Sequence, residues 1–323
     1  MSEGIEVVDV SRSFSTVQAV RSVTLTAEPG SITALIGPNG SGKTTLLLIL
    51  ATLLRPDAGH IRVAGHDPVR QPDEVRARMG WMPDILGSWA SLPVRATLEI
   101  AGRMYRLPKP TARHRAEELL ELVGLTELAA QPTRVLSRGQ KQRLSLARAL
   151  VHDPSVLLLD EPASGLDPAA RVDLRVLLQR LAQEGRTVLV SSHVLAELDE
   201  MATSAVYLDG GVSVSAERIA ASRTGLRPWR VRGVGAGPTA SSATAAADNA
   251  DSAALADALR AVGVPAERIR ADHLGLLVGV RDEADAAALL AALVTRGVAV
   301  SSFAPAFGEL EQTFLDLHRG DRS

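Results

Sequence analysis

A glycine-rich stretch that ends in a lysine and a threonine is the part of this sequence whose chemistry is easiest to predict. It fits the pattern GxxxxGK[ST], in which glycines let the backbone wrap closely around phosphates and N–H groups face the negative charge. Lys43 adds a mobile cation, and the hydroxyl of Thr44 can bind Mg²⁺. The alternative is a glycine-rich turn with an incidental lysine. We favour a phosphate site formed by Gly37, Pro38, Asn39, Gly40, Ser41, Gly42, Lys43, Thr44 and Thr45.

Two adjacent acidic residues follow an apolar run further along the chain. Residues 156–159 predict a buried strand, and Asp160 and Glu161 come at its end, where open α/β sheets collect their ligands. Because successive side chains of a strand point to opposite faces, we expect Asp160 to face a metal ion and Glu161 to face an attacking water. The alternative is that the two acids cap the helix that follows.

A predicted helix start carries groups that suit a second anion. Ser137 fits an N-cap, and Gln140, three residues later, completes a capping box. A helix N-terminus also favours negative charge, and Gly139 permits a close approach. Since the first loop already cradles one phosphate group, a second site of this kind suggests a nucleotide held between two chains.

In this order, the three segments resemble the ATP-binding cassette (ABC) family over about residues 5–215, with residues 136–140 (LSRGQ) as the signature. The resemblance implies ATP and Mg²⁺ as ligands. It also implies a head-to-tail dimer of ATP-binding subunits, identical or different. Ser137, Gly139 and Gln140 of one subunit would then meet the ATP held by Lys43 of the other.

The resemblance further assigns individual roles. Glu161 corresponds to the general base, and Asp160 to the Mg²⁺ ligand. His193 corresponds to a histidine that senses the γ-phosphate, although a lone histidine is usually structural. Asp167 ends a loop that communicates across the dimer. Phe14 matches an aromatic residue that stacks on adenine, and it fits a core residue equally well.

Two positions depart from the family pattern. Asp84 stands where the family usually has glutamine, near the nucleotide and the Mg²⁺ shell, and contact through water is the expectation. Arg138 replaces a common glycine of the signature, where it can add a cation near phosphate or point to solvent. Neither change removes a group that hydrolysis requires.

Apolar patterns predict the elements that position these residues. Residues 32–36 are uniformly apolar, as in a parallel strand covered on both faces, whereas residues 23–27 alternate, as in a half-buried strand. Residues 92–151 favour helices. We expect an α/β P-loop nucleotide-binding domain with a RecA-like parallel sheet core, an antiparallel β subdomain and a helical subdomain.

A second, smaller domain is predicted after Ser222, so that the domains span residues 1–222 and 223–323. Residues 233–251 are rich in small residues and favour a flexible segment. Beyond it, alternating helical and strand patterns predict an α+β domain. Its last residues, 308–315, resemble the end of accessory domains on exporter ATPases of the drug and polyketide-resistance type.

Composition limits the partners. The net charge is only −2, which argues against nucleic acid, and the absence of cysteine fits the cytoplasm. The N-terminus does not resemble a secretory signal, and the longest apolar-rich run, residues 46–54, is too short to span a membrane. We therefore expect a cytoplasmic exporter ATPase, held on the inner face of the membrane by a separate permease. The alternatives are a soluble ABC ATPase acting on chromosomes or ribosomes and, less favoured, a P-loop kinase.

Overall fold

The computed structural model of this chain describes residues 4–85, 87, 89–222, 225–234, 245–272 and 274–319. The chain forms two units, Met1–Ser215 and Ala216–Ser323. The prediction placed the boundary after Ser222, which is one short helix further along the chain. That helix, α8 (Ala216–Ser222), lies in the second unit, where it contacts α11 (Glu309–Arg319).

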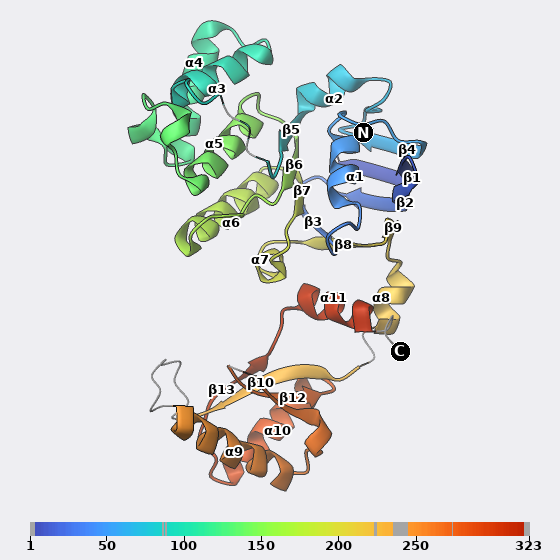
Figure 1. The fold of residues 1–323 in the computed structure, drawn as a ribbon, viewed down its shortest axis with the longest axis vertical. Coiled ribbons are helices and arrows are strands. Elements are labelled where there is room, and N and C mark those ends of the chain that lie inside the picture. The colour runs from blue at the N-terminus through green and yellow to red at the C-terminus, as the bar shows by residue number, and fades with distance from the viewer. Residues whose placement is uncertain are drawn as a thin grey trace. The chain divides into compact units, whose positions relative to one another are not determined.

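A nine-stranded sheet forms the centre of the first unit, in the order β4-β1-β2-β9-β8-β3-β7-β6-β5 (Figure 1). Its strands are β1 (Ile5–Phe14), β2 (Val17–Ala27), β3 (Ile32–Ile36), β4 (Ala58–Val63), β5 (Met79–Met82), β6 (Val156–Asp160), β7 (Thr187–Ser191), β8 (Ser204–Asp209) and β9 (Val212–Ser213).

The run from β8 to β5 is the parallel core that the apolar patterns predicted. Every residue of β3, β6 and β7 is buried, as expected for strands covered by helices on both faces. Aligned parallel strands end at one edge of the sheet. In this register Asp160 at the end of β6 lies beside Ser191 at the end of β7.

The other end of the sheet is antiparallel, as predicted. β1 pairs with both β2 and β4, and β8 and β9 form the predicted hairpin. The alternating pattern of residues 23–27 places Val23, Leu25 and Ala27 in the core, while Thr24 and Thr26 are exposed.

Helices cover both faces of the parallel core. α1 contacts β2 and β6, and α6 contacts β3 and β7. Figure 1 shows α1 and α6 on opposite sides of these strands. The predicted helical subdomain consists mainly of α3, α4 and α5. The helices of this unit are α1 (Lys43–Leu50), α2 (Pro72–Arg78), α3 (Val94–Met104), α4 (Lys109–Leu122), α5 (Arg138–Leu150), α6 (Pro168–Gln183) and α7 (Leu195–Asp199), with short 3-10 helices at Thr126–Leu128 and Thr133–Val135.

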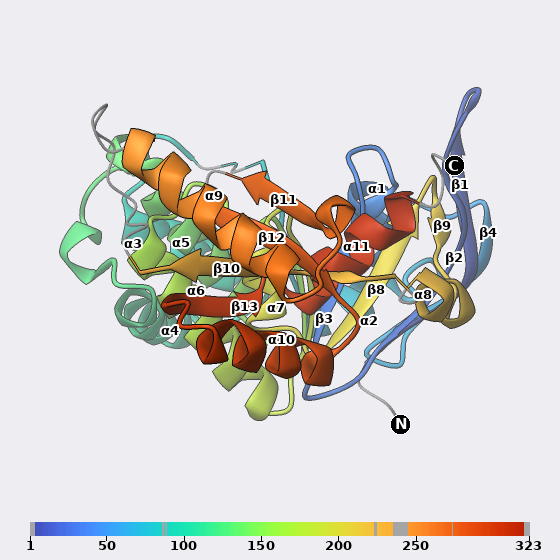
Figure 2. The same ribbon diagram turned by 90° about the horizontal axis from the view of Figure 1, so that it is seen from below.

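The second unit is a four-stranded antiparallel sheet in the order β11-β12-β10-β13, with α9 and α10 on one face (Figure 2). Val231, Leu259, Val278 and Leu293 are fully buried between the sheet and these helices. Besides α8 and α11, its elements are β10 (Arg227–Gly233), α9 (Ala245–Ala261), a 3-10 helix (Ala266–Arg268), β11 (Ile269–Asp272), β12 (Gly275–Val280), α10 (Glu283–Thr295) and β13 (Val300–Pro305).

The segment predicted to be flexible, residues 233–251, differs from the expectation at both ends. Gly233 is the last residue of β10, and α9 already begins at Ala245. The alanines that suggested a linker are also the strongest helix formers, which accounts for the earlier helix start. Residues 235–244 lie outside the described part of the chain.

Among the described residues, we find no helix whose length and apolar character would let it cross a bilayer.

Candidate nucleotide site

The predicted phosphate loop joins β3 to α1, and close backbone contacts require glycine at two of its positions, Gly37 and Gly42. A Cβ at Gly37 would lie 2.4 Å from the Leu208 carbonyl oxygen, and one at Gly42 would lie 2.5 Å from the Ala19 carbonyl oxygen. Gly42 also has φ 97°, a left-handed conformation that favours glycine. These contacts set the path by which the loop enters α1.

The α1 N-terminus offers main-chain donors to a ligand. Leu46 N–H makes the first helical hydrogen bond, to the Gly42 carbonyl, at 2.9 Å. The amides of Lys43, Thr44 and Thr45 come before it, and first-turn amides have no acceptor inside their own helix. The hydroxyl of Ser41, a residue only 2% exposed, has no hydrogen-bond partner among the described residues. Buried donors of this kind suit a phosphate oxygen.

Lys43 reaches back into the loop. Its Nζ donates to the carbonyl oxygens of Gly37 at 2.7 Å and Pro38 at 3.1 Å. Burial lowers the pKa of Lys43 from its ordinary value, and the nearby carboxylates of Glu161 and Asp160 act in the opposite direction. The ammonium group is therefore held inside the loop and close to the two predicted acids.

Asp160 is 4% exposed and receives two hydroxyl donors. Thr44 Oγ1 donates to Oδ2 at 3.3 Å, and Ser191 Oγ donates to Oδ1 at 2.5 Å. The structure thus brings together Thr44 and Asp160, the two residues predicted to share a metal ion. We did not predict Ser191 from the sequence; pairing the ends of the two buried runs, 156–160 and 187–191, would have found it.

Glu161 and His193 also meet. His193 Nδ1 lies 2.6 Å from Glu161 Oε2, with the glutamate side chain 17% and the histidine side chain 65% exposed. The Glu161 backbone has φ 52°, and its N–H donates to Ser191 at both the carbonyl oxygen and Oγ, each at 3.2 Å. A non-glycine residue in this region is strained, and such strain is frequent at functional sites.

The predicted second anion site is a well-formed capping box at the start of α5. Ser137 Oγ accepts from Gln140 N–H at 3.2 Å, and Gln140 Oε1 accepts from Ser137 N–H at 2.8 Å. The Gln140 side-chain oxygen is thus engaged by the cap. Arg138, one of the two departures from the family pattern, donates from Nη2 to Ser164 Oγ at 2.8 Å. Its guanidinium therefore holds the loop after β6.

Three further predicted residues lie at the ends of elements. Asp167 caps α6 by accepting from Ala170 N–H at 2.9 Å. Phe14, at the end of β1, is 41% exposed, with the Arg12 guanidinium 5.0 Å from its ring centroid, so it is not a core residue. Asp84 is exposed just beyond β5, the parallel neighbour of β6, and so lies at the same sheet edge as Asp160.

The side-chain oxygens at this edge of the sheet suit a metal ion that is also bound by phosphate. Within the described ranges, no group of three or more His, Cys, Asp and Glu residues could hold a metal alone. A hydroxyl and a single carboxylate, Thr44 and Asp160, match the sites in which Mg²⁺ takes one or two protein oxygens and completes its shell with phosphates and water.

Comparison with known proteins places this geometry in a family. Residues 20–164 match the family model described as ABC transporter. ABC transporter ATP-binding protein NatA of Bacillus subtilis is 36% identical over 64% of this chain and 86% of its own length. Daunorubicin resistance ATP-binding protein DrrA3 of Streptomyces coeruleorubidus is 41% identical over 60% of this chain and 61% of its own length, so the match spans less than two thirds of that relative.

A solved structure shares the fold of the first unit. The structure described as a dimeric post-hydrolysis state of an ATP-binding cassette bound to ADP and Pi superimposes with a TM-score of 0.62, at 25% identity. The alignment covers 65% of this chain and 97% of that one.

Proposed function

Because this chain belongs to the ABC transporter family of ATP-binding proteins, we propose that it binds and hydrolyses ATP to drive a separate membrane permease. One observation carries the proposal: the phosphate loop, the Asp160 carboxylate and the Glu161–His193 pair meet at one edge of the parallel sheet. A phosphate-binding loop alone would serve many nucleotide-binding proteins. An adjacent base held by a histidine suits hydrolysis.

In this proposal, each side chain acts on the phosphates or on the attacking water. The loop amides and Lys43 bind the β- and γ-phosphates, and Phe14 stacks on adenine. Thr44 and Asp160 would hold Mg²⁺, and Asp84 would contact the ion through a water molecule. The ion, when bound, neutralises phosphate charge. Glu161 accepts the proton of the attacking water, and His193 orients Glu161 and senses the γ-phosphate.

The site is completed by a second subunit, identical or different. In this proposal, Ser137, Gly139 and Gln140 at the α5 N-terminus would meet the ATP held on the opposite subunit. The dipole and the amides of this helix end favour an anion. The dimeric assembly of the similar cassette bound to ADP and Pi supports this arrangement. Asp167, at the start of α6, would communicate across the interface.

An exposed apolar patch supports a protein partner for the first unit. Met104 is 69% and Ile85 84% exposed, and with Trp89 and Tyr105 they line a cavity of about 720 Å³. Exposed apolar clusters of this kind mark interaction surfaces. We propose that a cytoplasmic loop of the permease docks there, which would hold the chain on the inner face of the membrane.

The direction of transport is proposed to be export. It is supported by relatives named for drug resistance, whose names describe those proteins. We also propose that the chain consists of a nucleotide-binding domain and a C-terminal accessory domain.

The rival function is that of a soluble ABC ATPase acting on chromosomes or ribosomes. The features described here do not favour this rival. Stimulation of the ATPase activity by nucleic acid or ribosomes would favour it.

The test uses the full chain with Glu161→Gln. This variant should bind Mg-ATP, form dimers in size-exclusion chromatography and hydrolyse ATP at least about 100-fold more slowly than the parent. In detergent extracts the tagged parent should co-purify with a membrane-spanning chain, and Met104→Glu should lose it without losing ATPase activity. A Glu161→Gln variant that turns over ATP like the parent would refute the proposal, whereas one that stays monomeric with ATP would exclude only an identical second subunit.

A further inference from the structure

Gln142 is a buried polar side chain of α5 that makes no contact with the phosphate loop in the hydrogen bonds described for this site, and it reaches the acidic pair from the helical subdomain. It is 2% exposed, and its Nε2 donates a 2.8 Å hydrogen bond to the main-chain carbonyl of Glu161. The bond joins the helical subdomain to the residue that follows β6. Because a buried amide group without a partner is costly, the Gln142 side chain keeps this bond and fixes the position of the Glu161 main chain.

The Glu161 residue is held on both sides. Its N–H is bound by Ser191, and its carbonyl by Gln142. With φ at 52°, Glu161 occupies a conformation that non-glycine residues rarely adopt, and such conformations persist only when their surroundings hold them. The backbone conformation in turn sets the direction of the side chain, whose carboxylate meets His193.

We infer that Gln142 is a positioning residue, which fixes the Glu161 carboxylate where it can accept the proton of the water that attacks ATP. The inference rests on the proposed role of Glu161 as the base. With this role for Gln142, α5 would act at two nucleotide sites. α5 begins at the tip proposed to meet the opposite subunit's ATP, so the Gln142 bond links the engagement of that tip to the base of this subunit's own site.

Two neighbouring contacts support the same link. Arg138, on the first turn of α5, donates to Ser164 Oγ at 2.8 Å. A Cβ at Gly139 would lie 3.4 Å from the Gly165 carbonyl oxygen, so the helix start packs closely on the loop after β6. Gln142 is the member of this contact set that reaches Glu161 itself.

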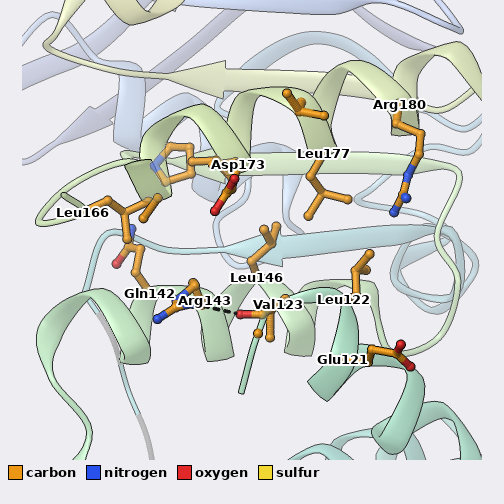
Figure 3. A pocket seen from close by; sticks show the side chains of 15 residues that line it. Glu121, Leu122, Val123, Gln142, Arg143, Leu146, Leu166, Asp173, Leu177 and Arg180 are labelled. Atoms are coloured by element: carbon orange, nitrogen blue, oxygen red, sulfur yellow. Dashed lines mark hydrogen bonds between the residues drawn. The ribbon is translucent and has the colours of Figure 1, made fainter. Parts of the chain in front are cut away.

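The space beside Gln142 makes the inference testable. Gln142 lines a cavity of about 400 Å³ between α5 and α6. Figure 3 shows Gln142, Arg143 and Leu146 on one side of it and Asp173, Leu177 and Arg180 on the other. Methionine has nearly the shape of glutamine and no donor, and with space alongside it should fit without overpacking.

The first experiment measures ATP hydrolysis and ATP binding by the full chain carrying Gln142→Met. We expect kcat to fall about 10- to 100-fold, the scale of a misplaced catalytic group, while the Kd for Mg-ATP stays within about twofold. Leu146→Ala is the matched control, because it removes a buried side chain from the same helix and cavity without touching Glu161. It should lower the melting temperature and leave kcat near the parent value.

A second variant separates positioning from packing by its pH profile. In Gln142→Glu, an ionised carboxylate repels the Glu161 carbonyl, whereas the protonated acid can donate to it, and burial raises the pKa of such a carboxyl. The kcat of this variant, divided by that of the parent, should therefore rise as the pH falls from about 8 to about 6. The same ratio for Gln142→Met should stay flat.

Two results would overturn the inference: parent-like kcat in Gln142→Met, or a Gln142→Glu profile that follows Gln142→Met at every pH. Glu161→Gln, assayed in parallel, keeps the two ideas apart. If Glu161→Gln hydrolyses ATP normally, the proposed function fails. If it is inactive while Gln142→Met is fully active, only the positioning role fails.

Discussion

The imidazole of His193 and the carboxylate of Glu161 are 2.6 Å apart, although the histidine follows β7 and the glutamate follows β6. The pair forms because the two parallel strands end in register at the same edge of the sheet. The histidine is the more exposed partner, so a ligand at this edge can reach it.

Removing this histidine should slow hydrolysis more than binding. In His193→Ala the Glu161 carboxylate loses the partner that orients it, and we expect kcat to fall about 100-fold, with ATP affinity changed far less. Steady-state hydrolysis and equilibrium ATP binding measure the two effects. His114→Ala, which removes an exposed histidine from α4, is the control and should match the parent. Equal losses in both variants would contradict a specific role.

Ser191 is expected to set the requirement for Mg²⁺. Its hydroxyl donates to Asp160 at 2.5 Å, so Ser191→Ala leaves a buried carboxylate oxygen with one donor fewer. The Mg²⁺ concentration for half-maximal ATPase activity should rise about 10-fold, as for other residues that orient a metal ligand. Ser192→Ala is the neighbouring control, because its hydroxyl accepts from Val194 N–H. An unchanged Mg²⁺ dependence in Ser191→Ala would exclude this role.

Phe14 should contribute to the binding of the adenine ring and not to the binding of the phosphates. We expect Phe14→Ala to weaken ATP binding by about 1–2 kcal/mol, the scale of stacking between an aromatic side chain and a base. Binding of inorganic triphosphate, which has no base, should stay the same. Val8→Ala, another exposed position on β1, serves as the control. Equal weakening of ATP and triphosphate by Phe14→Ala would contradict stacking.

His152 should make the stability of the chain depend on pH. Burial lowers the pKa of His152 to about 4, even though a hydrogen bond with the Met79 carbonyl acts the other way. Between pH 6.5 and 4 the unfolded chain binds a proton that the folded chain does not. The free energy of unfolding should therefore fall by about 3 kcal/mol as the pH drops through this range.

The variant His152→Phe checks this effect, because phenylalanine can keep the stacking on Tyr105, now at 3.6 Å between ring centroids. Losing the hydrogen bond to Met79 should cost about 1 kcal/mol at every pH. Urea unfolding from pH 7 to pH 4 should then show a shallower loss of stability than in the parent. Parallel pH profiles for the two proteins would assign the acid sensitivity to other groups.

The sequence by itself determined the features that depend on neighbouring residues. The phosphate loop is contiguous in the sequence, and Gly42 has the left-handed backbone conformation that favours glycine. The capping box joins Ser137 to Gln140, three residues apart on one helix turn. Uniformly apolar runs at residues 32–36 and 156–159 predicted the buried strands, because a strand covered on both faces carries apolar side chains on both of them.

Tertiary structure decided the contacts between residues far apart in the chain. Ser191 reaches Asp160 only because β6 and β7 align in one register. Gln142 stands among polar residues at the start of α5 and resembles a surface residue until packing buries it against the Glu161 carbonyl. Residue types and local spacing predict which groups can do the chemistry. Strand register and helix packing, which local patterns do not encode, decide which of them meet.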